Sequence, residues 1–86
     1  MYKIVINGGP VSPTQQIYVV EDNVICESIG ANYNDVAEVV DCFVNKYPVE
    51  IVELAGPYNY MQNFEKQIIQ DQIAHYSDKV LVFRYI

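Results

Sequence analysis

The sequence predicts one α/β domain with the element order β-β-β-α-β-α-β, a mixed five-stranded sheet in the strand order 3-2-1-4-5, and two helices. Three observations support this prediction. Two apolar runs flank Asp22-Asn23, a residue pair suited to a tight hairpin turn. Two later stretches repeat apolar residues with the period of a helix, and each stands between strand-like runs. Right-handed crossovers then make the first, fourth and fifth strands parallel and put the hairpin at the other edge.

The first three strands are predicted from short runs rich in β-branched residues. Residues 2–7 alternate as a strand does, and a proline-containing loop at residues 10–15, which we expect to be stiff, follows. Residues 16–21 and 24–29 form the hairpin, in which Asp22 and Asn23 tolerate the left-handed φ of a type I′ turn. The turn pairs Val20 with Ile25, Val19 with Cys26 and Tyr18 with Glu27, which puts Ile17, Val19, Cys26 and Ser28 on one face.

The first helix is predicted from apolar spacing. Apolar residues recur at intervals of three and four, which is typical of an amphipathic helix, at Val36, Val39, Val40, Phe43, Val44 and Tyr47. Asn32 or Asn34 is expected to cap this helix through its side-chain oxygen. Pro48 ends it, because the residue before a proline is disfavoured in helical conformation.

The second half of the chain predicts strand, helix and strand. Residues 49–55 form the fourth strand, which leads through Gly56-Pro57 into the second helix. Asn59 is the expected cap, with Gln62 three residues later as in a capping box. An apolar stripe is expected along this helix at Met61, Phe64, Ile68, Ile69, Ile73 and Tyr76. Residues 79–86 form the last strand, whose continuous apolar run predicts that both of its faces are covered.

Size, charge and cysteine usage argue against several classes of function. The chain has 86 residues and a net charge of −6, and its basic residues are scattered, whereas nucleic-acid binding needs a basic patch. No apolar run approaches the roughly 18 residues of a membrane span, and the N-terminus reads as a strand and not as a signal peptide. We therefore expect a cytoplasmic protein without a membrane partner. Cys26 and Cys42 lie in apolar patterns and are expected to be buried free thiols. His75 is expected at the surface near a helix end.

The predicted order resembles the ribonuclease H-like fold. The similar segments are residues 2–9, the hairpin at residues 17–29, the helix after it and residues 51–58, although the usual final helix is missing. Nuclease members of this family hold two metal ions between an Asp on the first strand and a carboxylate at the end of the fourth. The matching positions are Asn7 and Glu53. The resemblance thus implies a Mg²⁺ site in which Asn7 replaces the Asp as a neutral ligand. The competing fold is a ferredoxin-like α+β sandwich, in which the first strand or one hairpin strand is an addition.

A second candidate site combines glycines and tyrosines. Gly8-Gly9 follows a strand, where a bare backbone can approach a phosphate, but no helix N-terminus follows to supply amide donors. Tyr58-Asn59-Tyr60 lies at the carboxyl end of a parallel strand, where open α/β sheets bind ligands. Aromatic and amide groups together can recognise a base or a peptide. The alternatives are that Gly8-Gly9 is a turn that needs small residues and that the tyrosine rings cap the core.

The sequence supports two functions. The first is a small non-enzymatic protein that acts through protein–protein interaction, with a homodimer among the expected assemblies. Its basis is the lack of catalytic motifs together with eight Tyr residues and an acidic balance. The size and composition are also compatible with a phage or mobile-element accessory protein. The alternative is a reduced ribonuclease H-like nuclease or nucleic-acid processing domain that uses Mg²⁺ at Asn7 and Glu53.

Overall fold

A computed structural model describes residues 1–9 and 12–86 of the chain. Its elements are, in order, β1 (Tyr2–Asn7), β2 (Gln15–Glu21), β3 (Val24–Ala31), the 3₁₀ helix η1 (Tyr33–Asp35), α1 (Val36–Lys46), β4 (Val49–Ala55), the 3₁₀ helix η2 (Gly56–Tyr60), α2 (Asn63–Tyr76) and β5 (Val82–Tyr85). The predicted element order is therefore confirmed. Pro10 and Val11, the first two residues of the loop predicted to be stiff, lie outside the described residues.

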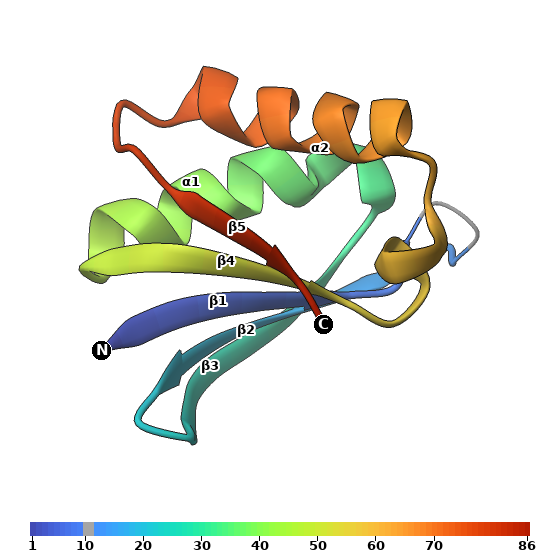
Figure 1. Cartoon of the computed structure of the whole chain (residues 1–86). Helices are drawn as coiled ribbons and strands as arrows, with labels where there is room; N and C mark the ends of the chain where they lie inside the picture. Colours follow the sequence, from blue (N-terminus) through green and yellow to red (C-terminus); the bar gives the residue numbers. More distant parts are fainter. Residues whose placement is uncertain (10–11) are drawn as a thin grey trace.

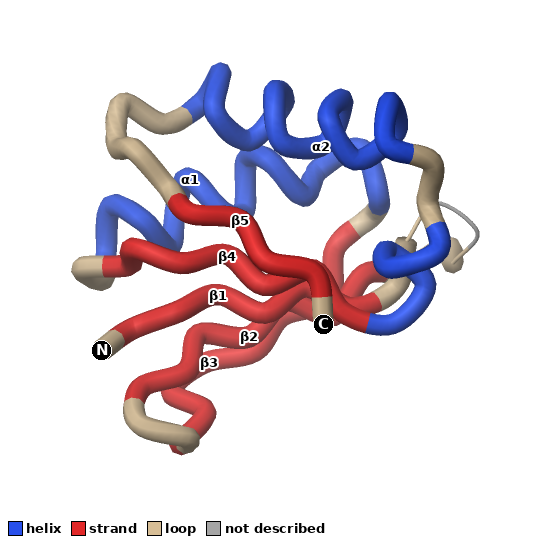
Figure 2. The backbone as a smooth tube through the Cα atoms, viewed as in Figure 1, coloured by secondary structure: helices blue, strands red, loops and turns tan. Residues whose placement is uncertain are grey.

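The strands form one mixed sheet in the predicted order β3-β2-β1-β4-β5. β2 is antiparallel to both β1 and β3, whereas β4 is parallel to both β1 and β5. Both helices lie on the same face of this sheet (Figure 1), which gives the molecule two layers (Figure 2). The ferredoxin-like alternative is wrong, because β1 is the central strand of the sheet and not an addition to a β-α-β-β-α-β unit.

The core lies between the sheet and the two helices. Ile4 and Ile6 of β1 pair with Val52 and Leu54 of β4, and all four side chains are fully buried. The inward face of the helices closes over them with Val36, Val40 and Phe43 of α1 and Ile69 and Ile73 of α2. Successive residues of a strand point to opposite faces, so Lys3 and Val5, which alternate with these isoleucines, face away from the helices.

The hairpin turn is as predicted, but the strand register is not. Asp22 and Asn23 both have positive φ, at 49° and 68°. Val20 pairs with Ile25 as expected, but the register shifts between Val19 and Val20, so that Val19 pairs with Glu27. Cys26 is the extra residue of a β-bulge. The predicted face of Ile17, Val19, Cys26 and Ser28 is therefore wrong, and Ile17 and Val19 instead share their face with Ile29 and Glu27.

The predicted helix caps are also wrong. Neither Asn32 nor Asn34 caps α1 through its side chain, because η1 intervenes, and there the Asp35 amide donates to the Asn32 carbonyl at 2.9 Å. Asn59 does not begin α2, because residues 56–60 form η2. The N-cap of the helix is Gln62, three residues later than predicted, and the Gln62 amide donates to Glu65 Oε1 at 3.1 Å across the first turn.

Two predictions of burial in the second half of the chain fail. Ile69 and Ile73 of α2 are buried, but Phe64 and Ile68 are exposed, because the helix turns its other side to the core. β5 is shorter than predicted and lies at the edge of the sheet, with Val82 exposed, so it is not covered on both faces. In the part of the chain that the structure describes, no helix is long and apolar enough to span a membrane.

Candidate functional site

Gly8, Gly9 and Tyr58 come together, but around a side chain of the protein itself. The fully buried Gln15 side chain accepts a hydrogen bond from the Tyr58 hydroxyl at 2.7 Å and donates to the Gly9 carbonyl at 2.8 Å. A Cβ at Gly8 would lie 2.4 Å from Gln15 Oε1, and one at Gly9 would lie 3.1 Å from the Pro57 ring. The two glycines therefore make room for Gln15 and Pro57, and this turn holds the β1 end against η2.

The tyrosine segment divides between core and surface. Tyr58 is fully buried, and burial raises the pKa of its hydroxyl well above the usual value of 10.0. Tyr60, two residues later, is 88% exposed. Asn59 lies between them and donates from its side chain to the Ile86 carbonyl next to β5. Tyr58 thus belongs to the core, whereas Tyr60 is free to contact a ligand.

Asn7 and Glu53 lie on the sheet face that the helices leave uncovered, but they are not partners. Glu53 pairs with Val5, and Asn7 pairs with the next residue but one along β4, Ala55. The Asn7 side chain lies over the backbone of η2, where a Cβ at Gly56 would be 2.6 Å from Asn7 Oδ1. Gly56 has φ of +66°, which also favours glycine there.

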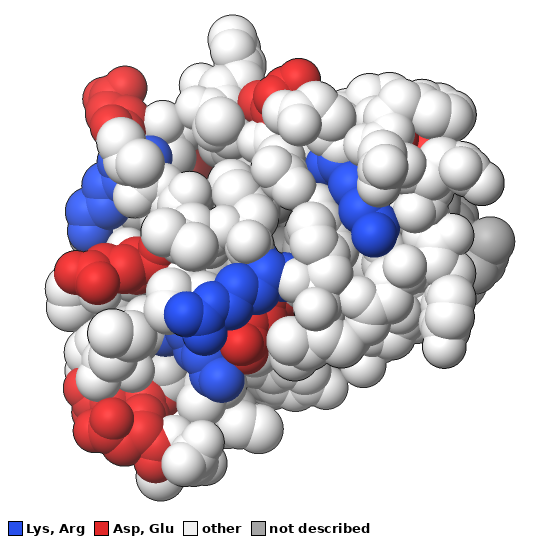
Figure 3. Space-filling model, viewed as in Figure 1, with Lys and Arg blue, Asp and Glu red and all other residues white. Residues whose placement is uncertain are grey.

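The charge of Glu53 is already balanced by a basic side chain. Lys3 Nζ lies 2.8 Å from Glu53 Oε1, and Glu53 is 6% exposed. Arg84 stands opposite Glu53 in the register of β4 and β5. Figure 3 shows basic side chains packed against an acidic one near the middle of the view. A divalent cation at Glu53 would add positive charge where Lys3 already lies, and the described residues contain no group of three or more acidic, His or Cys side chains placed to hold a metal ion.

A different surface, which the sequence analysis did not identify, lies along the edge strand β3. This strand is eight residues long and contains no Pro, Lys or Arg. Its outer edge pairs with no strand among the described residues. Val24, Ile25 and Ile29 are all exposed, Ile29 at 45%. Natural proteins usually protect such edges with charges, prolines, bulges or short length. β3 has a bulge at Cys26 and the charge of Glu27, but its last four residues, 28–31, carry none of these devices. An apolar edge that is left unprotected in this way is typical of a surface that pairs with another chain.

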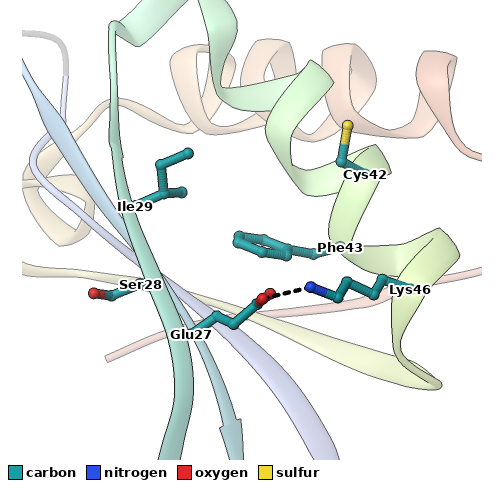
Figure 4. Close-up of a pocket in the computed structure, with 6 residues that line it drawn as sticks. All are labelled: Glu27, Ser28, Ile29, Cys42, Phe43 and Lys46. Carbon is teal, nitrogen blue, oxygen red and sulfur yellow. Dashed lines mark hydrogen bonds and ion pairs between the residues drawn. The ribbon is translucent and has the colours of Figure 1, made fainter.

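A groove runs between β3 and α1. Its first pocket, of about 450 Å³, is lined by Glu27, Ser28, Ile29, Cys42, Phe43 and Lys46. Figure 4 shows the Ile29 and Phe43 side chains facing each other across it, while the Ser28 side chain points away. Lys46 closes one end by binding Glu27 Oε1 at 2.5 Å, and this contact lowers the pKa of the Glu27 carboxyl.

A second pocket lies further along β3, toward the start of α1, and we call the two pockets together the groove. It has a volume of about 420 Å³ and is lined by Thr14, Gly30, Ala31, Asn32, Asp35 and Val39. Glu27, Ile29 and Ala31 alternate along β3, so they share the face toward α1, and each of them lines one of the two pockets. On the helix side, Asp35, Val39, Cys42 and Lys46 recur at intervals of three and four, which makes one continuous stripe.

The two cysteines lie on this side of the molecule and are exposed, so the prediction of buried thiols is wrong. Cys26 is the bulged residue of the edge strand, and Cys42 is on the flank of α1 that faces the groove. The apolar patterns around them are real, but the sheet extends no further than β3, and no described segment covers their side of it. His75 is exposed in the last turn of α2, as expected.

Two features of the sequence could have indicated this groove. The run at residues 24–31 has apolar residues and no gatekeeping charge except Glu27, while α1 shows a second apolar flank at Val39 beyond its core face. Both features are visible in the sequence, but only the strand order shows that β3 is an edge. Comparison with models of protein families, with curated proteins and with solved structures finds no match to this chain. The ribonuclease H-like resemblance therefore stays a prediction.

Proposed function

We propose that this protein acts by binding another protein, and that the edge of β3 with the adjoining groove is its contact surface. The observation that carries the proposal is the exposed edge of β3, unprotected over residues 28–31, beside the two pockets of the groove. An extended segment that pairs with such an edge gains backbone hydrogen bonds from the strand, and its alternate side chains enter the groove. This function needs no cofactor.

The opposite edge of the sheet supports the choice of β3. β5 has only four residues and carries Arg84, and Lys79 precedes it. Short length and basic residues are the usual means of preventing edge pairing. The bulge at Cys26 bends the first part of β3, which leaves residues 27–31 as the regular segment for pairing.

The alternative function, a reduced nuclease at Asn7 and Glu53, has less support. Lys3 balances the Glu53 carboxylate, and Asn7 contributes no charge. The origin in a phage or mobile element stays a prediction from composition.

The proposal can be tested with peptides selected from a displayed random library on the immobilised protein. Selected peptides should shift the backbone NMR signals of β3 and α1. They should bind the variant Ile29→Ser at least about five-fold more weakly, because its apolar contact is lost. The matched control is Ile68→Ser, since Ile68 is similarly exposed (50%) but lies on α2. Failure to select any peptide, or binding that is lost only in the Ile68→Ser variant, would contradict the proposal.

A homodimer is the other assembly to consider. Light scattering at several protein concentrations measures it directly. If the chain dimerises through β3, the Ile29→Ser variant should shift the equilibrium toward monomer, whereas Ile68→Ser should not.

A further inference from the structure

The groove has a chemical polarity along its length. At one end, the Glu27 carboxylate and the Lys46 ammonium neutralise each other. In the middle, Ile29, Phe43 and Cys42 make an apolar wall. At the other end stands Asp35, which is exposed and has no ion-pair partner among the described residues. The groove thus passes from neutral through apolar to acidic.

The negative charge at the acidic end of the groove is not cancelled by the dipole of α1, which begins there. The start of α1 carries about half a positive charge from the helix dipole. Asp35 and Glu38 both lie at this start and together bring two full negative charges. No basic residue lines the second pocket. A cation near Asp35 is therefore favoured, also because the whole chain carries a net charge of −6.

Resting on the proposed function, we infer that the partner is an extended segment carrying an apolar side chain and, two residues away, a Lys or Arg. Alternate side chains of a strand are about 6.6–6.8 Å apart on one face. A segment paired with residues 27–31 thus presents one side chain beside Ile29 and the next beside Ala31 and Asp35. The first fills the apolar pocket, and the second meets the carboxylate.

A second copy of this chain fits the groove less well. β3 itself contains no Lys or Arg. Pairing β3 with β3 of another copy would therefore leave both Asp35 side chains without a basic partner and would bring two chains of charge −6 together. β5 of a second copy has an apolar and a basic residue two positions apart, Val82 and Arg84, but it is only four residues long and its chain also carries a charge of −6. A basic segment of a different protein is therefore the better match in charge.

The order of the two side chains depends on the direction of the bound strand. Along β3, Ile29 of the apolar pocket comes before Ala31, which lines the second pocket together with Asp35. A segment parallel to β3 needs the apolar residue first, and an antiparallel segment needs the basic residue first. The free edge of a strand accepts either direction.

Four uncharged-end pentapeptides test this inference by NMR titration of the full chain. Two have the sequence acetyl-Thr-Leu-Thr-Lys-Thr-amide and its reverse order, with Lys before Leu. The other two replace Lys by Gln. In one of the two directions, the Lys peptide should bind about three-fold more tightly than its Gln counterpart, as an exposed ion pair allows. The difference should shrink in high salt.

Two variants assign that difference to Asp35. In Asp35→Asn, the Lys and Gln peptides should bind equally. In Asp71→Asn, which removes the same charge from the exposed side of α2, the three-fold preference should persist. Persistence of the preference in Asp35→Asn would show that the net charge of the chain causes it and would overturn the inference.

The outcomes separate the inference from the proposed function. Equal binding of Lys and Gln peptides that Ile29→Ser weakens would leave the proposed function standing and reject the basic segment. Dimerisation through β3 without peptide binding would also reject the basic segment, because a second copy would then be the occupant. No shift of β3 signals with any peptide, in a chain that stays monomeric, would reject both.

Discussion

Replacing Tyr58 by Phe tests the polar contact on which the β1 turn depends. The Tyr58 hydroxyl donates to Gln15 Oε1 at 2.7 Å, and both side chains are fully buried. The variant keeps the ring and its packing but leaves Gln15 Oε1 buried without a donor. An unsatisfied buried acceptor costs about 1–3 kcal/mol of stability. A loss of about 1.5 kcal/mol would lower the melting temperature of a domain of this size by about 6–12 °C.

The assay is urea and thermal unfolding followed by circular dichroism. Tyr60→Phe is the matched control, because Tyr60 is exposed and its hydroxyl has no partner among the described residues. Its free energy of unfolding should stay within about 0.5 kcal/mol of the wild-type value.

A second substitution shows whether the two side chains are coupled. Gln15→Met should cost more than Tyr58→Phe, because Gln15 also donates to the carbonyls of Gly9 and Ser12, at 2.8 and 3.0 Å. The double variant removes the Tyr58 hydroxyl and Gln15 Oε1 together. Its loss of stability should therefore be smaller than the sum of the two single losses, by about 0.5–2 kcal/mol. A folded Tyr58→Phe variant as stable as the wild type, or strict additivity, would refute the assignment of Gln15 and Tyr58 as one buried polar unit.

Three further predictions concern charge, pH and metal. Lys3→Met should lower the free energy of unfolding by about 2 kcal/mol, because it leaves the nearly buried Glu53 without its ion-pair partner. The control Lys79→Met, at an exposed position, should change it little. Equal stabilities of the two variants in urea unfolding would contradict this prediction. Because burial raises the pKa of Tyr58 above 10.0, the stability that it contributes is fully present below pH 10 and is lost as the pH rises further. The free energy of unfolding, measured between pH 8 and pH 12, should therefore fall less steeply with pH in Tyr58→Phe than in the wild type. Parallel curves would show that the Tyr58 hydroxyl does not cause this fall. Millimolar Mg²⁺ should leave the melting temperature unchanged, since Lys3 balances Glu53; a rise that Glu53→Gln abolishes would restore the nuclease alternative.

Several features of the fold follow from local chemistry that the sequence displays. Asp22 and Asn23 are residue types that accept positive φ, so they place the hairpin turn without reference to the rest of the chain. The spacing of Val36, Val40 and Phe43 predicts the buried face of α1, and Pro48 its end. The right-handed crossover is equally general, and with the short hairpin it was enough to predict the strand order.

The errors arise where burial depends on segments distant in sequence. Cys26 and Cys42 lie in apolar runs like those of the core, but the sheet ends at β3 and leaves them exposed. Phe64 and Ile68 continue the apolar period of α2, yet both are exposed. The 3₁₀ helix η2 precedes α2 and sets the orientation in which α2 packs on the sheet, and in this orientation they face outward. The apolar run at residues 80–83 predicts a strand with both faces covered. In the described chain, β5 is instead the last strand of the sheet and Val82 is exposed.

The candidate sites show the same division. Local sequence brought attention to Gly8, Gly9 and Tyr58, and these residues do meet, but the side chain that fills the space between them is Gln15, which no motif marks. The groove is formed by residues 27–31 and by one flank of α1, whose proximity depends on the bulge and on the helix packing. Periodicity and turn chemistry act over a few residues, so the sequence alone determined the elements and their order. Which face is covered, which edge is free and which charges are already paired depend on contacts between distant segments, so only the tertiary structure decided them.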